Sequence, residues 1–266
     1  MLKDAYVRLR FSPGLQVTMG QFKRPFDLFE LSSSTDLSLI ERDGRVGGVN
    51  ACAGVGGVCS YSRLTEKLGL ADRDIGVRVA GEKGKVAYEL SVTNGAGQNV
   101  ADENDAKSFS GRMSVEVAPK LSVSGNLASH DYVDPSKKDA RASAWGVDAQ
   151  YGTWRDGLLV QASLVGGDNW KKLDAAADPA PFVAFQGAAS WYAPVKGKRL
   201  VGVEPIVRLS WADPNRDEAH DGGMIVTPGL MLYVSGRSKI GFNWDVWLPQ
   251  KGVTEHSLKV QSFLYF

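Results

Sequence analysis

The sequence of 266 residues contains no long apolar run. A helix needs about 18 or more consecutive apolar residues to cross a bilayer, so a helical membrane protein is excluded. An excess of one charge sign is also lacking, because 31 Lys and Arg residues stand against 30 Asp and Glu residues and leave a net charge of +1. Without a basic excess, we expect no nucleic-acid partner.

Groups suited to catalysis are scarce as well. The three histidines, His130, His220 and His256, fall in expected loops, and none has a nucleophile or carboxylate at the spacing of a catalytic motif. The glycine-rich stretch 54–57 lacks the Lys and the strand-to-helix setting of a phosphate-binding loop. We therefore expect no enzyme, no catalytic residue, no metal site and no cofactor.

The composition fits a β-protein. Hydrophobic residues make up 43%, mean hydropathy is −0.19, and there are 30 glycines. The strands of a transmembrane barrel alternate apolar with polar residues, so such a barrel has a soluble-looking average composition. A soluble β-sandwich fits the same composition, and the order of the segments must decide between them.

Period-2 alternation of apolar residues predicts thirteen strands and few helices. The expected strands are 5–11, 15–22, 75–82, 86–94, 109–118, 121–129, 144–153, 158–166, 182–193, 200–212, 225–236, 239–248 and 258–266. The connections between them alternate between short and long, as they do in an outer-membrane barrel with tight periplasmic turns and longer extracellular loops. We predict an all-β, antiparallel up-and-down transmembrane barrel that forms one domain over residues 1–266.

The two ends of the sequence lead to different predictions. Phe266, with Leu264 on the same face of the last strand, is expected to be the signal read by the barrel-assembly machinery, and it places the last strand end at the periplasmic rim. The start lacks a signal peptide and runs directly into strand pattern. Because barrels usually have an even strand number and a periplasmic N-terminus, we expect an odd number of leading strands to be missing.

Strand alternation divides the residues between a lipid-facing side and a lumen-facing side. The expected lumen side carries cations and anions in nearly equal number. These are Arg8, Arg10, Arg78, Arg112, Arg208 and Lys259, with Glu89, Glu116, Asp148, Glu204 and Asp245. The wall alone therefore does not make an anion filter, and selectivity must come from charges gathered at a constriction.

The connection over residues 23–74 is far longer than an ordinary loop and is the candidate constriction. An inward-folded loop would narrow the barrel, and Lys23, Arg24, Arg42 and Arg45 could replace part of an anion's hydration shell. The alternative is a solvated extracellular loop with ordinary surface charge.

Five short segments resemble the signature of the phosphate-selective porin O and P family: 20–26 (GQFKRPF), 31–33 (LSS), 40–42 (IER), 73–77 (RDIGV) and 93–97 (TNGAG). The resemblance implies a channel of 16 strands, in which Arg and Lys side chains guide phosphate, polyphosphate or other small anions. It also implies a homotrimer surrounded by outer-membrane lipid in a Gram-negative bacterium. Three strands would then be missing before residue 1.

The sequence departs from the family pattern between Arg45 and Asp72, where a glycine-rich stretch contains both cysteines. An exported location favours a disulfide between Cys52 and Cys59 over free thiols. Two other functions stay open: a general-diffusion or organic-acid porin, and a non-channel surface β-protein that binds a partner.

Overall fold

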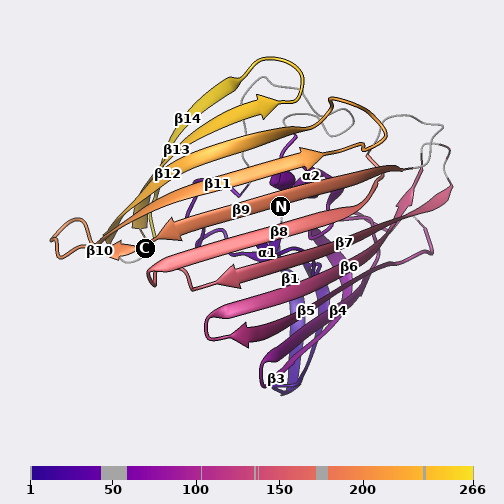
Figure 1. Ribbon diagram of the computed structural model, residues 1–266. Coiled ribbons are helices and arrows are strands. Elements are labelled where there is room, and N and C mark those ends of the chain that lie inside the picture. Colours follow the sequence, from indigo (N-terminus) through magenta and orange to yellow (C-terminus); the bar gives the residue numbers. More distant parts are fainter. Residues whose placement is uncertain are drawn as a thin grey trace.

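The chain folds into one curved antiparallel sheet in which each long strand pairs with the next (Figure 1). The computed structural model describes residues 2–42, 59–102, 104–134, 136, 138–171, 179–235 and 238–265. The strands are β1 Ala5–Ser12, β2 Leu15–Lys23, β3 Arg73–Lys83, β4 Val86–Thr93, β5 Ser108–Ala118, β6 Leu121–Val133, β7 Asp139–Tyr151, β8 Leu158–Asn169, β9 Ala180–Trp191, β10 Ala193–Pro194, β11 Gly202–Asp213, β12 Gly223–Ser235, β13 Ser238–Pro249 and β14 Glu255–Phe263.

All thirteen predicted strands are present, and the two-residue β10 is an addition that pairs with β11. Consecutive antiparallel pairing places the short turns at one rim of the sheet and the long connections at the other. Within the described residues, β1 and β14 each pair on one side only and form the edges of the sheet.

The strand boundaries lie within three residues of the predicted ones, except at the end of β6 and the start of β7. The connection predicted over residues 131–143 is much shorter, because β6 and β7 remain paired as far as Val133 and Asp139. Polar outward residues at this rim interrupt the apolar alternation but not the backbone pairing. The last strand ends at Phe263 rather than at residue 266, because Phe263 pairs with Lys239, close to the start of β13 at Ser238.

The two faces of the sheet differ in chemistry, as the alternation predicts. We call the face that contacts the long connection the inner face and the opposite one the outer face. On the outer face Leu90, Leu127 and Leu209 are exposed, whereas the inner residues Asn126, Ser163 and Arg208 are buried. An apolar outside and a polar inside are the arrangement of a membrane barrel with an aqueous interior.

The long connection contains two helices, α1 Leu28–Leu31 and α2 Tyr61–Leu68. Within the described residues, neither helix is long and apolar enough to cross a membrane. Both helices lie against the inner face (Figure 1). The prediction that this connection folds inward is therefore confirmed for its described parts, residues 23–42 and 59–74.

Candidate functional site

Helix α2 is amphipathic and packs its apolar side on the sheet. Tyr61, Leu64, Thr65 and Leu68 recur at helical spacing and are buried. The helix ends at Gly69, whose φ of 64° favours glycine and whose N–H donates to the carbonyl of Thr65 at 3.0 Å. This is a regular helix stop, so the sequence itself fixes where the helix ends.

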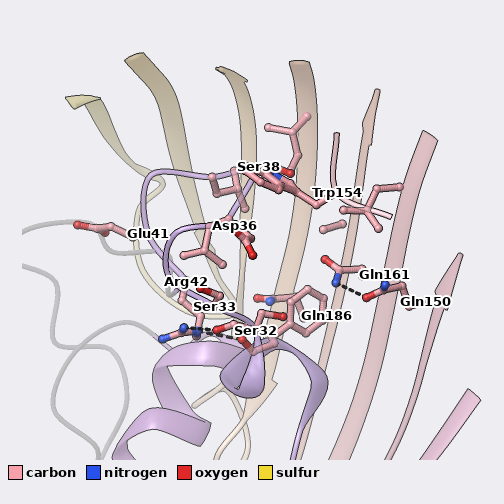
Figure 2. A pocket seen from close by; sticks show the side chains of 16 residues that line it. Ser32, Ser33, Asp36, Ser38, Glu41, Arg42, Gln150, Trp154, Gln161 and Gln186 are labelled. Atoms are coloured by element: carbon pink, nitrogen blue, oxygen red, sulfur yellow. Dashed lines mark hydrogen bonds between the residues drawn. The ribbon is translucent and has the colours of Figure 1, made fainter. Parts of the chain in front are cut away.

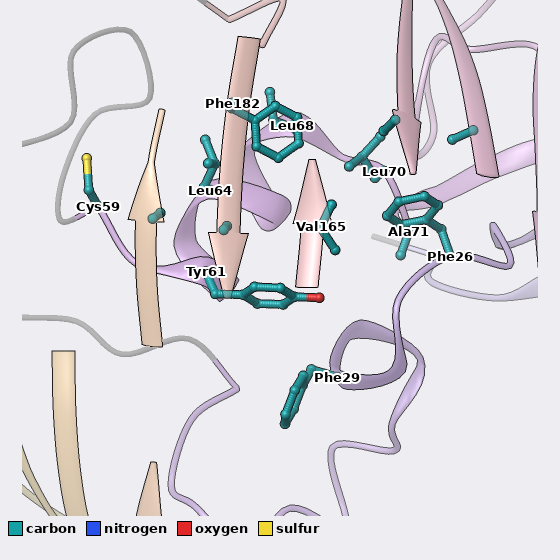
Figure 3. Close-up of a cluster of buried hydrophobic side chains, with 14 of the residues drawn as sticks. Phe26, Phe29, Cys59, Tyr61, Leu64, Leu68, Leu70, Ala71, Val165 and Phe182 are labelled. Atoms are coloured by element: carbon teal, nitrogen blue, oxygen red, sulfur yellow. The ribbon is translucent and has the colours of Figure 1, made fainter. Parts of the chain in front are cut away.

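A cluster of buried apolar side chains holds the long connection to β8 and β9 (Figure 3). Phe26, Phe29, Leu64 and Leu68 belong to this cluster, together with sheet residues such as Phe182, which is 2% exposed. Burial of these side chains is worth about 1.5–3 kcal/mol each. The connection is therefore a packed element of the interior.

Polar contacts fix how the two helices are oriented on the sheet. The Tyr61 hydroxyl donates to Asp27 Oδ1 at 2.7 Å and lies 2.5 Å from Ser163 Oγ of β8. Asp27 also accepts from the N–H of Phe29 at 3.0 Å and so begins α1. Burial raises the pKa of Asp27 to about 6 and also raises the pKa of Tyr61.

A second group of contacts fixes residues 37–42 to β11, β13 and β14. Ser38 donates to Glu204 at 2.6 Å, and Arg208 donates to the carbonyl of Arg42 at 2.9 Å. Lys239 donates to the carbonyl of Leu37, and Lys259 pairs with Glu41 at 2.7 Å. These hydrogen bonds and this ion pair hold residues 37–42 against the sheet.

A hollow of about 530 Å³ lies between the long connection and β1–β4, and we call it the basic hollow. Six cationic side chains line it against the two carboxylates of Asp4 and Glu89: Lys3, Arg8, Lys23, Arg42, Arg73 and Arg78. Ser32, Ser33 and Ser34 form part of the loop side. Excess positive charge beside neutral hydroxyl donors is suited to a small oxyanion.

The cations of the basic hollow differ in their partners. Arg73 pairs with Asp4 at 2.9 Å, and Arg78 pairs with Glu89 at 3.0 Å. Arg8 instead donates to the neutral hydroxyl groups of Thr18 at 3.3 Å and Tyr6 at 3.4 Å. Within the described residues no carboxylate lies within ion-pair distance of Arg8. Its positive charge is therefore available to a bound anion.

The loop side of the basic hollow is held by its own cations. Arg42 donates to the carbonyls of Phe29 at 2.9 Å and Ser32 at 2.7 Å, and Lys23 donates to the carbonyl of Glu30. Burial, followed by the nearby charge of Asp27, raises the pKa of Glu30 to about 8. Glu30 Oε2 lies 4.0 Å from Arg42 Nη1, so protonation of Glu30 would remove a carboxylate charge beside Arg42.

A second hollow of about 220 Å³ lies between the long connection and the sheet (Figure 2). Ser32, Ser33 and Arg42 line both hollows. Its sheet side carries the amides of Gln150, Gln161 and Gln186, and Gln161 donates to Gln150 at 2.8 Å. We call it the amide hollow, because neutral side chains dominate its sheet wall.

The structure brings four of the predicted anion-path residues, Arg8, Lys23, Arg42 and Arg78, into the basic hollow. Arg10 is exposed on the same face of β1 but does not line the hollow, and Arg45 lies outside the described residues. Sequence reasoning missed Lys3 and Arg73 as lining residues. Arg73 stands in a segment used for the family resemblance, so a signal was available for it.

Three other predicted residues serve internal contacts. Arg24 is 3% exposed, and its Nη1 lies 2.9 Å from His130 Nδ1. Arg112 pairs with Asp148 at 2.5 Å, and Arg208 pairs with Asp245 at 3.3 Å. Each of these arginines holds the loop to the sheet or holds neighbouring strands together.

The remaining predicted residues lie at the edges of the described structure. Cys59 is buried and disulfide-bonded, and its Sγ lies 3.3 Å from the carbonyl oxygen of Asp221. Cys52 lies outside the described residues, so its pairing with Cys59 stays a prediction. Leu264 is exposed beyond β14, and Phe266 lies outside the described residues, so the assembly signal also stays a prediction.

Comparisons with known proteins agree with this geometry. The family model described as phosphate-selective porin O and P matches residues 1–152. No curated protein matches the chain.

Solved structures show the same fold at low sequence identity. The outer membrane channel DcaP of Acinetobacter baumannii has a TM-score of 0.57 at 13% identity, covering 93% of this chain and 71% of its own. A porin refined at 1.8 Å resolution has a TM-score of 0.51 at 14% identity, covering 97% and 80%. OmpT of Vibrio cholerae has a TM-score of 0.50 at 11% identity, covering 89% and 67%.

Proposed function

Because the chain belongs to the phosphate-selective porin O and P family and is an outer-membrane porin of a Gram-negative bacterium, we propose that its channel conducts phosphate through the basic hollow. A water-filled channel rather than an enzyme is the function of this family. The observation that carries the proposal is the excess of cations, six against two carboxylates, in a hollow bounded by the inward-folded loop.

The chemistry of the hollow suits phosphate. Guanidinium groups match the oxygens of phosphate with paired N–H donors, and charge-assisted hydrogen bonds are stronger than neutral ones. Arg8 and Arg42 would provide such donors, and Ser32, Ser33 and Ser34 would replace water around the remaining oxygens. Several weak sites in sequence allow an ion to enter and also to leave.

The loop acts as the constriction in this proposal. Apolar packing through Phe29 and Leu64 fixes its helices, while Arg208 and Lys259 fix residues 41–42. A loop held on two sides cannot move away when an anion binds to Ser33 or Arg42. We also assign Lys23 and Arg78 to the anion path, together with Arg45, which lies outside the described residues.

A second function, organic-acid transport, is favoured by one observation. The amide hollow adjoins the basic hollow through Ser32, Ser33 and Arg42. A dicarboxylate with an uncharged polar middle could place its charges on the arginines and its polar part against Gln150 and Gln161. Phosphate has no such second part, so the adjoining amides would favour the dicarboxylate.

Planar-bilayer recording separates these functions. A KCl gradient across a bilayer that contains the purified porin should give a reversal potential of an anion-selective channel. Added phosphate should reduce the chloride current at a lower concentration than malate does, a dicarboxylate with a hydroxyl group between its charges. Block by malate at the lower concentration would favour the organic-acid porin, and cation preference would contradict both.

We also propose that residues 1–266 belong to a single barrel domain and that the porin is a homotrimer. The continuous strand order from β1 to β14 supports the first proposal. Membership of the porin family supports the second. Cross-linking followed by mass measurement in detergent would test the trimer, and a monomeric mass would contradict it.

A further inference from the structure

The outer face of the sheet carries an apolar groove of about 660 Å³ over β3–β6. Its volume lies within the roughly 300–1,000 Å³ range of ligand sites in proteins. Val77, Leu90, Val92, Phe109 and Leu127 line it, and each is more than a third exposed. In an outer-membrane porin this face contacts the acyl chains of lipid.

The groove exists because Gly111 has no side chain. Gly111 pairs with Leu90 on one side and with Leu127 on the other. The two leucine side chains therefore form the sides of the groove, and the backbone at Gly111 forms its base. Leu90 and Leu127 are 58% and 69% exposed. A Cβ at Gly111 would meet Leu90 Cδ2 at 3.0 Å, and that flexible side chain could move aside.

A cation stands at the end of the groove nearest the long connections, the rim that the sequence predicts to be extracellular. Arg141 of β7 is exposed, donates to Ser129 Oγ at 3.1 Å and lies with its Cζ 5.9 Å from the ring centroid of Phe109. Both Ser129 and Phe109 line the groove. Lys107 nearby is neutralised by Asp102 at 2.6 Å, whereas no carboxylate of the described residues pairs with Arg141.

We propose that this groove binds one acyl chain of a phosphorylated glycolipid of the outer leaflet, of the lipid A class, with its phosphate on Arg141. The groove supplies an apolar channel for the chain, and Arg141 supplies charge complementarity at the level of the headgroup. Phe109 lies between the two, and barrels carry girdles of aromatic residues at the membrane interface. The site is separate from the anion path on the inner face.

The test uses the full-length porin, purified in detergent and mixed with hexa-acylated lipid A, followed by native mass spectrometry. Gly111→Leu fills the groove and should abolish retained lipid A. Its matched control is Gly125→Leu, which adds the same side chain to the outer face where no atom lies within 4 Å of the new Cβ. The control should retain lipid A as the wild type does.

The headgroup contact has its own variant. Arg141→Gln should weaken lipid A binding about fivefold, as expected for about 1 kcal/mol per cation beside an anionic lipid surface. Lys85→Gln at the opposite rim is the control and should leave binding unchanged. Equal binding of phosphatidylethanolamine, equal retention of lipid A in all variants, or a change of oligomeric state with Gly111→Leu would overturn the proposal. The last result would make the groove a contact between copies of the chain.

Discussion

The Tyr61 hydroxyl reaches Asp27 Oδ1 at 2.7 Å and so joins the two helices of the long connection above β8. Both residues are fully buried. The bond ties the two helices together, because Asp27 caps the N-terminus of α1 and Tyr61 is the first residue of α2. The shape of the basic hollow depends on these helices staying in place.

Tyr61→Phe removes that link while it keeps the aromatic ring. The carboxylate of Asp27 then loses a buried donor, which costs about 1–3 kcal/mol of loop docking. Hydrogen exchange at the amides of α2 should accelerate accordingly. Tyr88→Phe, which removes a hydroxyl bonded to the carbonyl of Gly14 at the opposite rim, should leave that exchange unchanged. Equal exchange in both variants would contradict the role of Tyr61.

The pKa of Asp27 makes docking of the loop depend on pH. Its pKa rises from 3.8 when the loop is undocked to about 6 when it is buried. Between these values the docked state binds more protons, so docking weakens as pH rises, by about 3 kcal/mol in total. Below pH 4 the effect is absent, and above pH 6 it is complete.

Hydrogen exchange of α2 at pH 4 to 7, corrected for the intrinsic amide rates, measures this effect. The wild type should lose protection as pH rises through this window. Asp27→Asn keeps an acceptor for Phe29 and Tyr61 without a titrating proton, so its protection should fall less steeply with pH, and the remaining slope comes from Glu30, whose pKa is also raised by burial. Equal slopes in the wild type and the variant would contradict the pKa assignment of Asp27.

Arg112 and Asp148 form a buried pair between β5 and β7, with side chains 10% and 2% exposed. Arg112→Met leaves Asp148 without its cation and should destabilise the barrel by about 3–5 kcal/mol. Urea unfolding followed by intrinsic fluorescence checks this. The double variant Arg112→Met with Asp148→Leu should recover most of the loss. Anion selectivity should stay unchanged, since neither side chain lines the basic hollow.

The strands were predictable because alternation and turn residues are local signals. Helix α2 could also have been predicted, since Tyr61, Leu64 and Leu68 are at helical spacing and Gly69 follows. The place of the loop could not, because its contacts join distant residues, as Tyr61 and Ser163 do. Local sequence carries no information on such pairs.

The same limit explains the basic hollow. Alternation placed Arg8, Arg78, Arg112 and Arg208 on one face, and the structure confirms this. Which of them keeps its charge available depends on neighbours across the sheet and on the loop above it. Arg112 meets Asp148 and Arg208 meets Asp245, whereas Arg8 meets two hydroxyl groups and the ring of Tyr6 and pairs with no carboxylate among the described residues.

Phosphate block of the chloride current in Arg8→Gln and Arg10→Gln tests the central claim most directly. Both variants remove one arginine from the inner face of β1, but only Arg8 lines the basic hollow. Arg8→Gln should need roughly threefold to tenfold more phosphate for half block, in line with about 1 kcal/mol for one charge contact in a wet site. Arg10→Gln should match the wild type. Equal block in all three proteins would contradict a phosphate path through the basic hollow.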